Sequence, residues 1–142
     1  MLFLTIFFSA CSVKLPTYKE VKVENVNFDS AKDKKLAKAF LEYWKARVRG
    51  EYTTSYKYEL PYQRYIFDYK TYRKQIGSIY PGATVVLTKI EYKAPNVAVV
   101  SREVKLGKKV YKKKDKWIYV DGEWYHKFYQ NIMPSLKDAE YQ

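Results

Sequence analysis

The chain has 142 residues, a formal net charge of +12, one cysteine and one histidine. This length suits a single domain, and 47% hydrophobic residues argue against disorder. One cysteine excludes an internal disulfide and a multi-cysteine zinc site, and one histidine disfavours a catalytic zinc site. The composition therefore predicts no metal and no cofactor, in a basic protein that attracts polyanions.

An apolar run opens the chain, from Leu2 to Phe8, and two small residues separate it from Cys11. The run is too short to cross a membrane as a helix, which needs about 20 apolar residues. It fits a secretory signal that ends at small residues. The last four residues, Phe8 to Cys11, resemble the lipobox of bacterial lipoproteins, in which a peptidase cuts before the cysteine and its sulfur carries a diacylglycerol.

This resemblance implies a location as well as a modification. Residues 1–10 would be a signal peptide, and residues 11–28 the lipidated cysteine and a tether with an edge strand near Val21. Acyl chains would hold the protein at a membrane of the bacterial envelope. Ser12, after the cysteine, favours the periplasmic face of the outer membrane over the inner one. The alternative is a buried N-terminal strand with a free thiol.

The first helix is predicted to begin at Ala31 and to end before Gly50. Asp29 or Ser30 is the expected N-cap, with Asp33 placed to complete a capping box after Ser30. Gly50 is a typical C-terminal stop. Apolar residues follow helical spacing at Leu36, Phe40, Leu41, Trp44 and Val48.

A second helical region is rich in tyrosine. Pro61 suits a first helical turn, so we expect a short helix before it and a longer helix from Pro61 to just before Gly77. One face of this longer helix would carry a wide stripe, formed by Tyr62, Tyr65, Ile66, Tyr69, Tyr72 and Ile76.

After residue 82 the apolar period changes from 3.6 to 2, which is typical of strands. Four β-rich segments, 83–92, 97–106, 110–120 and 123–129, are separated by turns short enough for hairpins. The sequence therefore predicts an α+β domain in which N-terminal helices pack on a curved four-stranded antiparallel sheet.

The turn at 121–122 has the sequence Asp-Gly, which a type I′ turn favours. With those two residues as the loop, Tyr119 lies opposite Trp124, and Trp117 lies opposite His126. Cross-strand partners share a face of the sheet, so these four side chains form one aromatic surface. We expect that surface to face inward.

Residues 116–126, with Trp117, the Asp-Gly turn and Trp124, resemble the closing hairpin of the nuclear-transport-factor-2-like superfamily, which includes ketosteroid isomerases and polyketide cyclases. The order of elements is also similar. The resemblance implies a cystatin-like cone over residues 29–130, followed by a tail over 131–142. The cavity of such a cone would have as pocket residues Tyr65, Tyr69, Trp117, Tyr119, Trp124 and His126.

The function expected from these features is a noncatalytic binding or scaffolding module that takes a small apolar ligand or a protein partner. The alternative is an isomerase- or cyclase-like enzyme with His126 or Asp68 as base, and Tyr65 or Tyr69 donating to an oxyanion. A third candidate is a component of envelope assembly. We favour His126 as a satisfied core or rim residue and a solvent-facing Asp68, and leave enzymatic activity open.

Seven lysines lie between positions 105 and 116. They either protect an edge strand from unwanted pairing or contact an anionic lipid surface or an envelope protein. The excess of lysine over arginine and the lack of a nucleic-acid-binding signature argue against nucleic acid. A homodimer formed through the sheet is a further candidate. The residues expected at an anionic surface are Lys108, Lys109, Lys112, Lys113, Lys114 and Lys116.

Overall fold

The computed structural model describes residues 15, 18–76 and 82–128. The expected lipidation site, Cys11, and the expected tail, 131–142, lie outside the described residues. The elements follow in the order β1 (Val21–Val23), α1 (Ala31–Arg49), α2 (Tyr52–Lys57), α3 (Pro61–Ile66), α4 (Tyr69–Gln75), β2 (Thr84–Ala94), β3 (Val97–Leu106), β4 (Lys109–Val120) and β5 (Glu123–His126). The predicted α+β class is confirmed.

The strands form one curled sheet, a half-barrel, in the order β1-β2-β3-β4-β5. Strands β2 to β5 are the predicted antiparallel meander, and β1 adds to β2 in parallel, with Val21 opposite Val85. The prediction of four antiparallel strands was therefore wrong in number, because the lead-in segment supplies backbone partners to the edge of β2 and buries Val21 completely.

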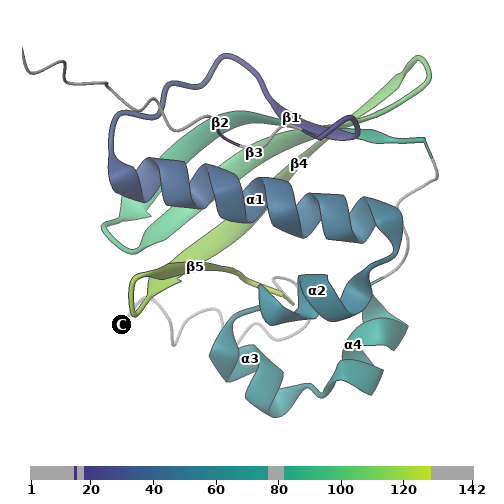
Figure 1. Cartoon of the computed structure of the whole chain (residues 1–142), viewed down its shortest axis with the longest axis vertical. Coiled ribbons are helices and arrows are strands. Elements are labelled where there is room, and N and C mark those ends of the chain that lie inside the picture. Colours follow the sequence, from purple (N-terminus) through teal and green to yellow (C-terminus); the bar gives the residue numbers. More distant parts are fainter. Residues whose placement is uncertain (1–14, 16–17, 77–81, 129–142) are drawn as a thin grey trace, which may run out of the picture.

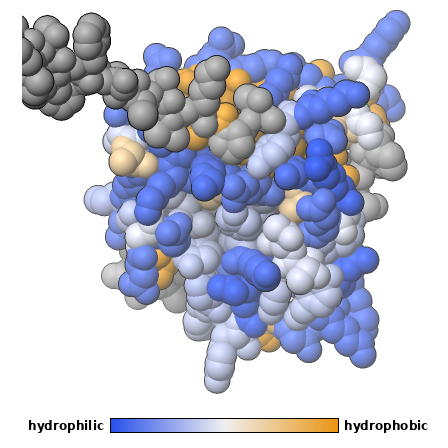
Figure 2. Space-filling model, viewed as in Figure 1, coloured by the Kyte–Doolittle hydropathy of each residue, from blue (hydrophilic) through white to orange (hydrophobic). Residues whose placement is uncertain are grey.

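The longest helix, α1, lies on the inner face of this sheet (Figure 1). Figure 1 shows α1 crossing the inner face of the sheet, with α2, α3 and α4 gathered below it beside β5. The face in this view is mostly hydrophilic, with only scattered apolar residues (Figure 2). Within residues 18–76 and 82–128, no helix is both long and apolar enough to cross a membrane.

The ends of α1 follow the prediction. The Ser30 hydroxyl accepts a hydrogen bond from the Asp33 amide at 3.1 Å, and the Asp33 carboxylate accepts one from the Ser30 amide at 3.4 Å. This reciprocal pair is the predicted capping box. At the other end, Gly50 takes a left-handed conformation with φ of 73° and closes the helix.

Replacing Ser30 with alanine is expected to lower the free energy of unfolding by about 1 kcal/mol, because the Asp33 amide loses its acceptor. Urea denaturation of the variant and the wild type measures the difference. Asp29→Ala is the matched control, since Asp29 is adjacent but is not the N-cap. An equal loss in both variants would contradict the assignment of the cap.

The tyrosine-rich region departs from the prediction of one long helix. Two short helices form instead, because the Asp68 carboxylate accepts a hydrogen bond from the Thr71 amide at 2.8 Å and starts α4 as its N-cap. An aspartate side chain that accepts a hydrogen bond from a nearby backbone amide competes with the backbone carbonyl that would continue the helix. The Tyr56 hydroxyl donates to the Phe67 carbonyl at 2.7 Å and holds the break. The expected stripe is therefore divided between two helices.

The closing hairpin matches its prediction. Asp121 and Gly122 both have positive φ, 49° and 82°, as a type I′ turn requires. The register pairs Trp117 with His126 and Tyr119 with Trp124. Trp117, His126 and Trp124 are buried, so the aromatic face of the hairpin is the inward one.

Aromatic side chains fill the space between α1 and the hairpin. Phe40, Tyr43 and Trp44 project from α1 and are buried. The rings of Phe40 and Tyr43 lie 6.4 and 5.6 Å from the Trp117 ring, the second in an edge-on arrangement. These distances suit favourable aromatic pairs. The inner side of the half-barrel is thus packed by rings around His126.

Candidate functional site

A buried ionic network is centred on His126, the last residue of β5. Its Nδ1 lies 2.8 Å from a carboxylate oxygen of Glu59, and its Nε2 lies 3.8 Å from a carboxylate oxygen of Asp115. The three residues are exposed by only 7%, 1% and 4%. Buried charges are stable in proteins only when they are paired in this way.

Backbone contacts bring the two carboxylates to the ring. The segment between α2 and α3 runs beside β5: the His126 amide donates to the Tyr58 carbonyl at 2.7 Å, and the Leu60 amide donates to the His126 carbonyl at 2.9 Å. Glu59 therefore lies next to His126 across this bridge. Asp115 reaches the site because it lies two residues before Trp117 on β4 and so shares its face.

The network extends on both sides of the central three residues. Toward the helices, the Tyr43 hydroxyl donates to Glu59 at 2.7 Å and accepts from the Arg47 guanidinium at 2.9 Å. Toward the sheet, the Arg102 guanidinium donates to Asp115 at 2.8 Å. Charges of opposite sign alternate along this path, so each buried charge has a neighbour that compensates it.

Aromatic groups complete the path. The Trp44 indole N–H donates to Asp115 at 3.0 Å, and the Arg102 guanidinium lies 4.0 Å from the centre of the same Trp44 ring. The Tyr43 ring stacks on His126 with 4.4 Å between ring centres. Hydrogen bonds and cation–π contacts therefore replace the water that these charges lose on burial.

Electrostatics keep the His126 ring protonated. Burial alone would lower its pKa, but the carboxylates of Glu59 and Asp115 outweigh burial and raise the pKa to about 9. Burial alone would raise the pKa of Asp115, but the His126 ring and the Arg102 guanidinium outweigh burial and hold this pKa below its ordinary value. Burial and the nearby Glu59 charge raise the pKa of Tyr43 well above its ordinary value.

This arrangement gives His126 no free lone pair at neutral pH. The ring is an imidazolium that donates from Nδ1 to Glu59 and directs Nε2 at Asp115. It is not one of the lining residues of the pockets described below. The network therefore acts as a structural element that fixes β4, β5 and the α2–α3 segment relative to α1.

Asp68, the second residue considered as a catalytic base, lies away from this network. Asp68 is exposed at the start of α4, where the hydrogen bond from the Thr71 backbone lowers the pKa of its carboxyl. Its carboxylate is a helix cap and does not meet His126.

Four of the six expected pocket residues come together. Trp117, Trp124 and His126 are buried on the inner face, and Tyr119 packs on Trp124 with 5.0 Å between ring centres. The other two tyrosines do not join them. Tyr65 is 91% exposed on α3, and Tyr69 is 39% exposed on α4, where its ring lies against Tyr56 and Tyr72.

The lysines expected at an anionic surface lie on β4 and the turn before it. Lys108, Lys109, Lys112, Lys113 and Lys114 are exposed, and Lys116 is half-buried. Lys112 and Lys114 lie on the outer face of the sheet, whereas Lys113 shares the face of Asp115.

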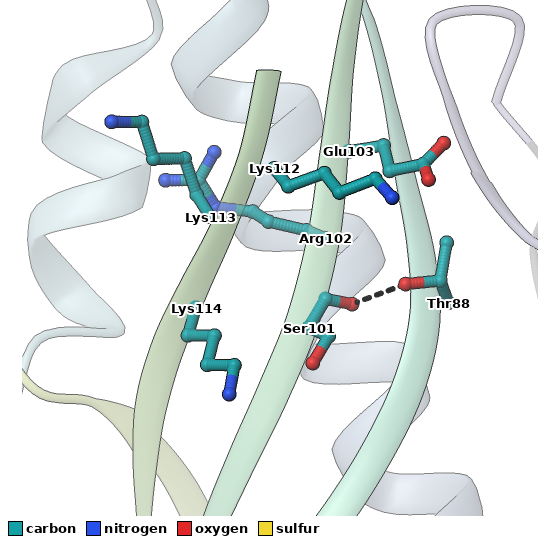
Figure 3. Close-up of a pocket in the computed structure, with 7 residues that line it drawn as sticks. All are labelled: Thr88, Ser101, Arg102, Glu103, Lys112, Lys113 and Lys114. Atoms are coloured by element: carbon teal, nitrogen blue, oxygen red, sulfur yellow. Dashed lines mark hydrogen bonds between the residues drawn. The ribbon is translucent and has the colours of Figure 1, made fainter. Parts of the chain in front are cut away.

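A pocket of about 420 Å³ lies over this part of β3 and β4. In Figure 3, Lys112 extends over β3 toward the side of Glu103, and Lys113 points away to the other side of β4. Among the described residues, neither lysine has a carboxylate within 4 Å. The pocket is lined by Thr88, Ser101, Arg102, Glu103, Lys112, Lys113 and Lys114.

A second pocket, of about 310 Å³, lies where the start of α3 meets the outer face of the sheet. It is apolar, and its lining residues are Leu60, Pro61, Tyr62, Val97, Ile118 and Val120. Neither pocket suggests a metal. In the part of the chain that the structure describes, no three side chains of the types that ligate metals form a group that could hold an ion.

Sequence reasoning missed most of the ionic network. Asp115 offered one signal, since it is a single acid in a run of lysines and shares the inward parity of Trp117. The ion pair between Arg102 and Asp115 could be predicted only once the register of β3 and β4 was known. Glu59 offered no signal, because nothing local shows that the loop between α2 and α3 pairs with β5.

Comparison with known proteins adds little to this geometry. No protein-family model matches the chain, and no curated protein sequence matches it. A solved structure with a similar arrangement is that of a SEC-C motif containing protein from Rhodopseudomonas palustris, at 13% identity and a TM-score of 0.48. The match covers 65% of this chain and 74% of that one. A likeness of this size carries no functional argument, which has to come from the residues themselves.

Proposed function

We propose that this protein is a noncatalytic binding or scaffolding module, held by a lipid at Cys11 in the bacterial cell envelope. The observation that carries the noncatalytic part is the state of His126: a buried imidazolium with carboxylates at both nitrogens is a fixed structural charge. The enzymatic alternative required a free base at His126 or Asp68, and no described contact favours it.

The fold part of the proposal is a cystatin-like cone of the nuclear-transport-factor-2-like kind over residues 29–130. The order of helices before the meander, and the Trp117 and Trp124 hairpin with its type I′ turn, support it. Rings of α1 and the hairpin occupy the space that a ligand cavity would take. Binding on an outer surface is accordingly the favoured mode.

The surface proposed for binding is formed on β4 and the turn before it by Lys108, Lys109, Lys112, Lys113 and Lys114. Its lysines are exposed and in excess over nearby acids, which suits an anionic lipid surface or an acidic region of an envelope protein. Outer-membrane placement with the domain on the periplasmic face, and a homodimer formed through the sheet, belong to the same proposal.

The anchor is tested by the intact mass of the protein purified from a membrane fraction. We expect a mature chain that begins at Cys11 and carries added acyl mass, because the lipobox resemblance implies cleavage and acylation there. The Cys11→Ala variant should lack the acyl mass and leave the membrane fraction. Ser12→Ala is the matched control, since it changes the next residue and keeps the thiol.

An unprocessed wild-type chain in the soluble fraction would contradict the anchor. The basic surface would then have to serve a polyanion elsewhere in the cell, and the envelope location would be withdrawn.

A further inference from the structure

The two neighbours of β4 differ greatly in length. Strand β4 has 12 residues and pairs with β3 from Lys109 to Ile118, whereas β5 has 4 residues and pairs only with Trp117–Val120. From Lys109 to Lys114 every residue of β4 is exposed. Figure 1 shows the hairpin of β3 and β4 extending past the end of α1. Within the described residues, the edge of this half of β4 has no neighbouring strand.

The hydrogen bonds of β4 identify which backbone groups face that edge. The Lys116 carbonyl accepts from the Lys127 amide at 2.8 Å, on the β5 side, whereas the Tyr119 amide donates to the Asn96 carbonyl at 2.8 Å, on the β3 side. Backbone groups of successive strand residues point in opposite directions. The amides and carbonyls of Lys112 and Lys114 therefore point to the open edge, and those of Lys113 point to β3.

The side chains define what such an edge accepts. Lys112 and Lys114 project from one face of β4 and Lys113 from the other, and none of them has a carboxylate within 4 Å among the described residues. Two copies of this edge would repel each other, which is a common way to prevent self-pairing. An incoming strand that carries carboxylates would instead be attracted on either face.

We propose that the open edge of β4, residues 109–115, binds an extended acidic segment of a partner protein as an additional strand of the sheet. Added strands of this kind gain affinity from main-chain hydrogen bonds and specificity from alternate side chains. The inference deepens the proposed function and rests on it, because it names the partner of the binding module. A lipid surface would use the lysine charges alone and leave the backbone groups of Lys112 and Lys114 to water.

The first test uses the full-length chain and a nine-residue peptide of alternating glutamate and threonine. Hydrogen exchange of individual amides is followed by NMR with and without saturating peptide. We expect the Lys112 and Lys114 amides to exchange at least about tenfold more slowly with peptide, because they gain acceptors, and the Lys113 amide to change little. Peptide binding without this alternating protection would overturn the proposal, as would binding of anionic vesicles but not of the peptide.

The second test separates the backbone from the charge. Lys114→Pro removes one cation and the N–H that faces the open edge, whereas Lys114→Gln removes the cation and keeps the N–H. We expect the peptide to bind Lys114→Pro about threefold to tenfold more weakly than Lys114→Gln. Equal affinities would overturn the proposal. The exchange experiment needs no substitution, so it decides the matter even where the proline variant misfolds.

Neither test depends on the anchor. A chain that lacks acyl mass but protects Lys112 and Lys114 on binding peptide would fail the proposed location and keep this inference. An acylated chain without that protection would do the reverse.

Discussion

Replacing His126 with phenylalanine is expected to lower the free energy of unfolding by about 3–5 kcal/mol, the range found when one partner of a buried ion pair is removed. Phenylalanine keeps a ring that can stack on Tyr43, so packing is largely preserved. The loss arises because Glu59 and Asp115 remain buried without the cation between them. Urea denaturation of the variant and the wild type at pH 6 measures it.

The matched control is Glu123→Gln, which changes a charge at an exposed position of the same strand. Its side chain lies 3.8 Å from Lys35 at the surface, so its effect should be below about 1 kcal/mol. A His126→Phe loss as small as the control would contradict the charge assignment of the network.

Stability is expected to fall by about 3 kcal/mol as the pH rises from 6.5 to above 9. The His126 pKa is about 9 in the folded protein and 6.5 for an ordinary histidine, so the folded state binds the proton more tightly. That contribution is complete below pH 6.5 and is lost as the pH rises through about 9. Its size follows from about 1.4 kcal/mol for each pKa unit. Urea denaturation across this range measures it.

At acidic pH, stability is expected to fall as the pH falls, which is the opposite of the dependence at alkaline pH. Because the pKa of Asp115 is held below its ordinary 3.8, its contribution is present above that pH and disappears as the pH falls through the lowered value. Stability should therefore be greatest between about pH 4 and 6.5. The His126→Phe variant is the control for the alkaline loss, and a decline as steep in that variant as in the wild type would show that another group titrates.

Much of the fold could be predicted because its signals are local. Ser30 and Gly50 mark the ends of α1 through their own side-chain and backbone preferences, and the residues at 121–122 fix the hairpin register without reference to the rest of the chain. That register in turn placed Trp117 and His126 on the inward face.

The features that sequence did not reveal depend on distant partners. The break at Asp68 reflects a choice between capping and continuing a helix, which the Tyr56 contact to Phe67 helps decide. An edge strand was expected near Val21, but its parallel pairing with β2, about sixty positions later, was not. Glu59 meets His126 across 67 positions, and no periodicity encodes such a contact.

The bridge between Glu59 and His126 also bears on how the chain emerges during synthesis. Arg47, Tyr43 and Glu59 are made first, and the last strand brings the imidazolium 67 residues later. Until then the Glu59 carboxylate can accept the hydrogen bond from Tyr43 but lacks the one to His126. Burial of this carboxylate is therefore opposed by the free energy needed to remove it from water. We therefore expect helices α1 to α4 to remain loosely packed against one another on the ribosome, and to pack firmly on the sheet only when β5 has been made. For a chain that is proposed to leave the cytoplasm, late closure would keep it open for as long as export requires.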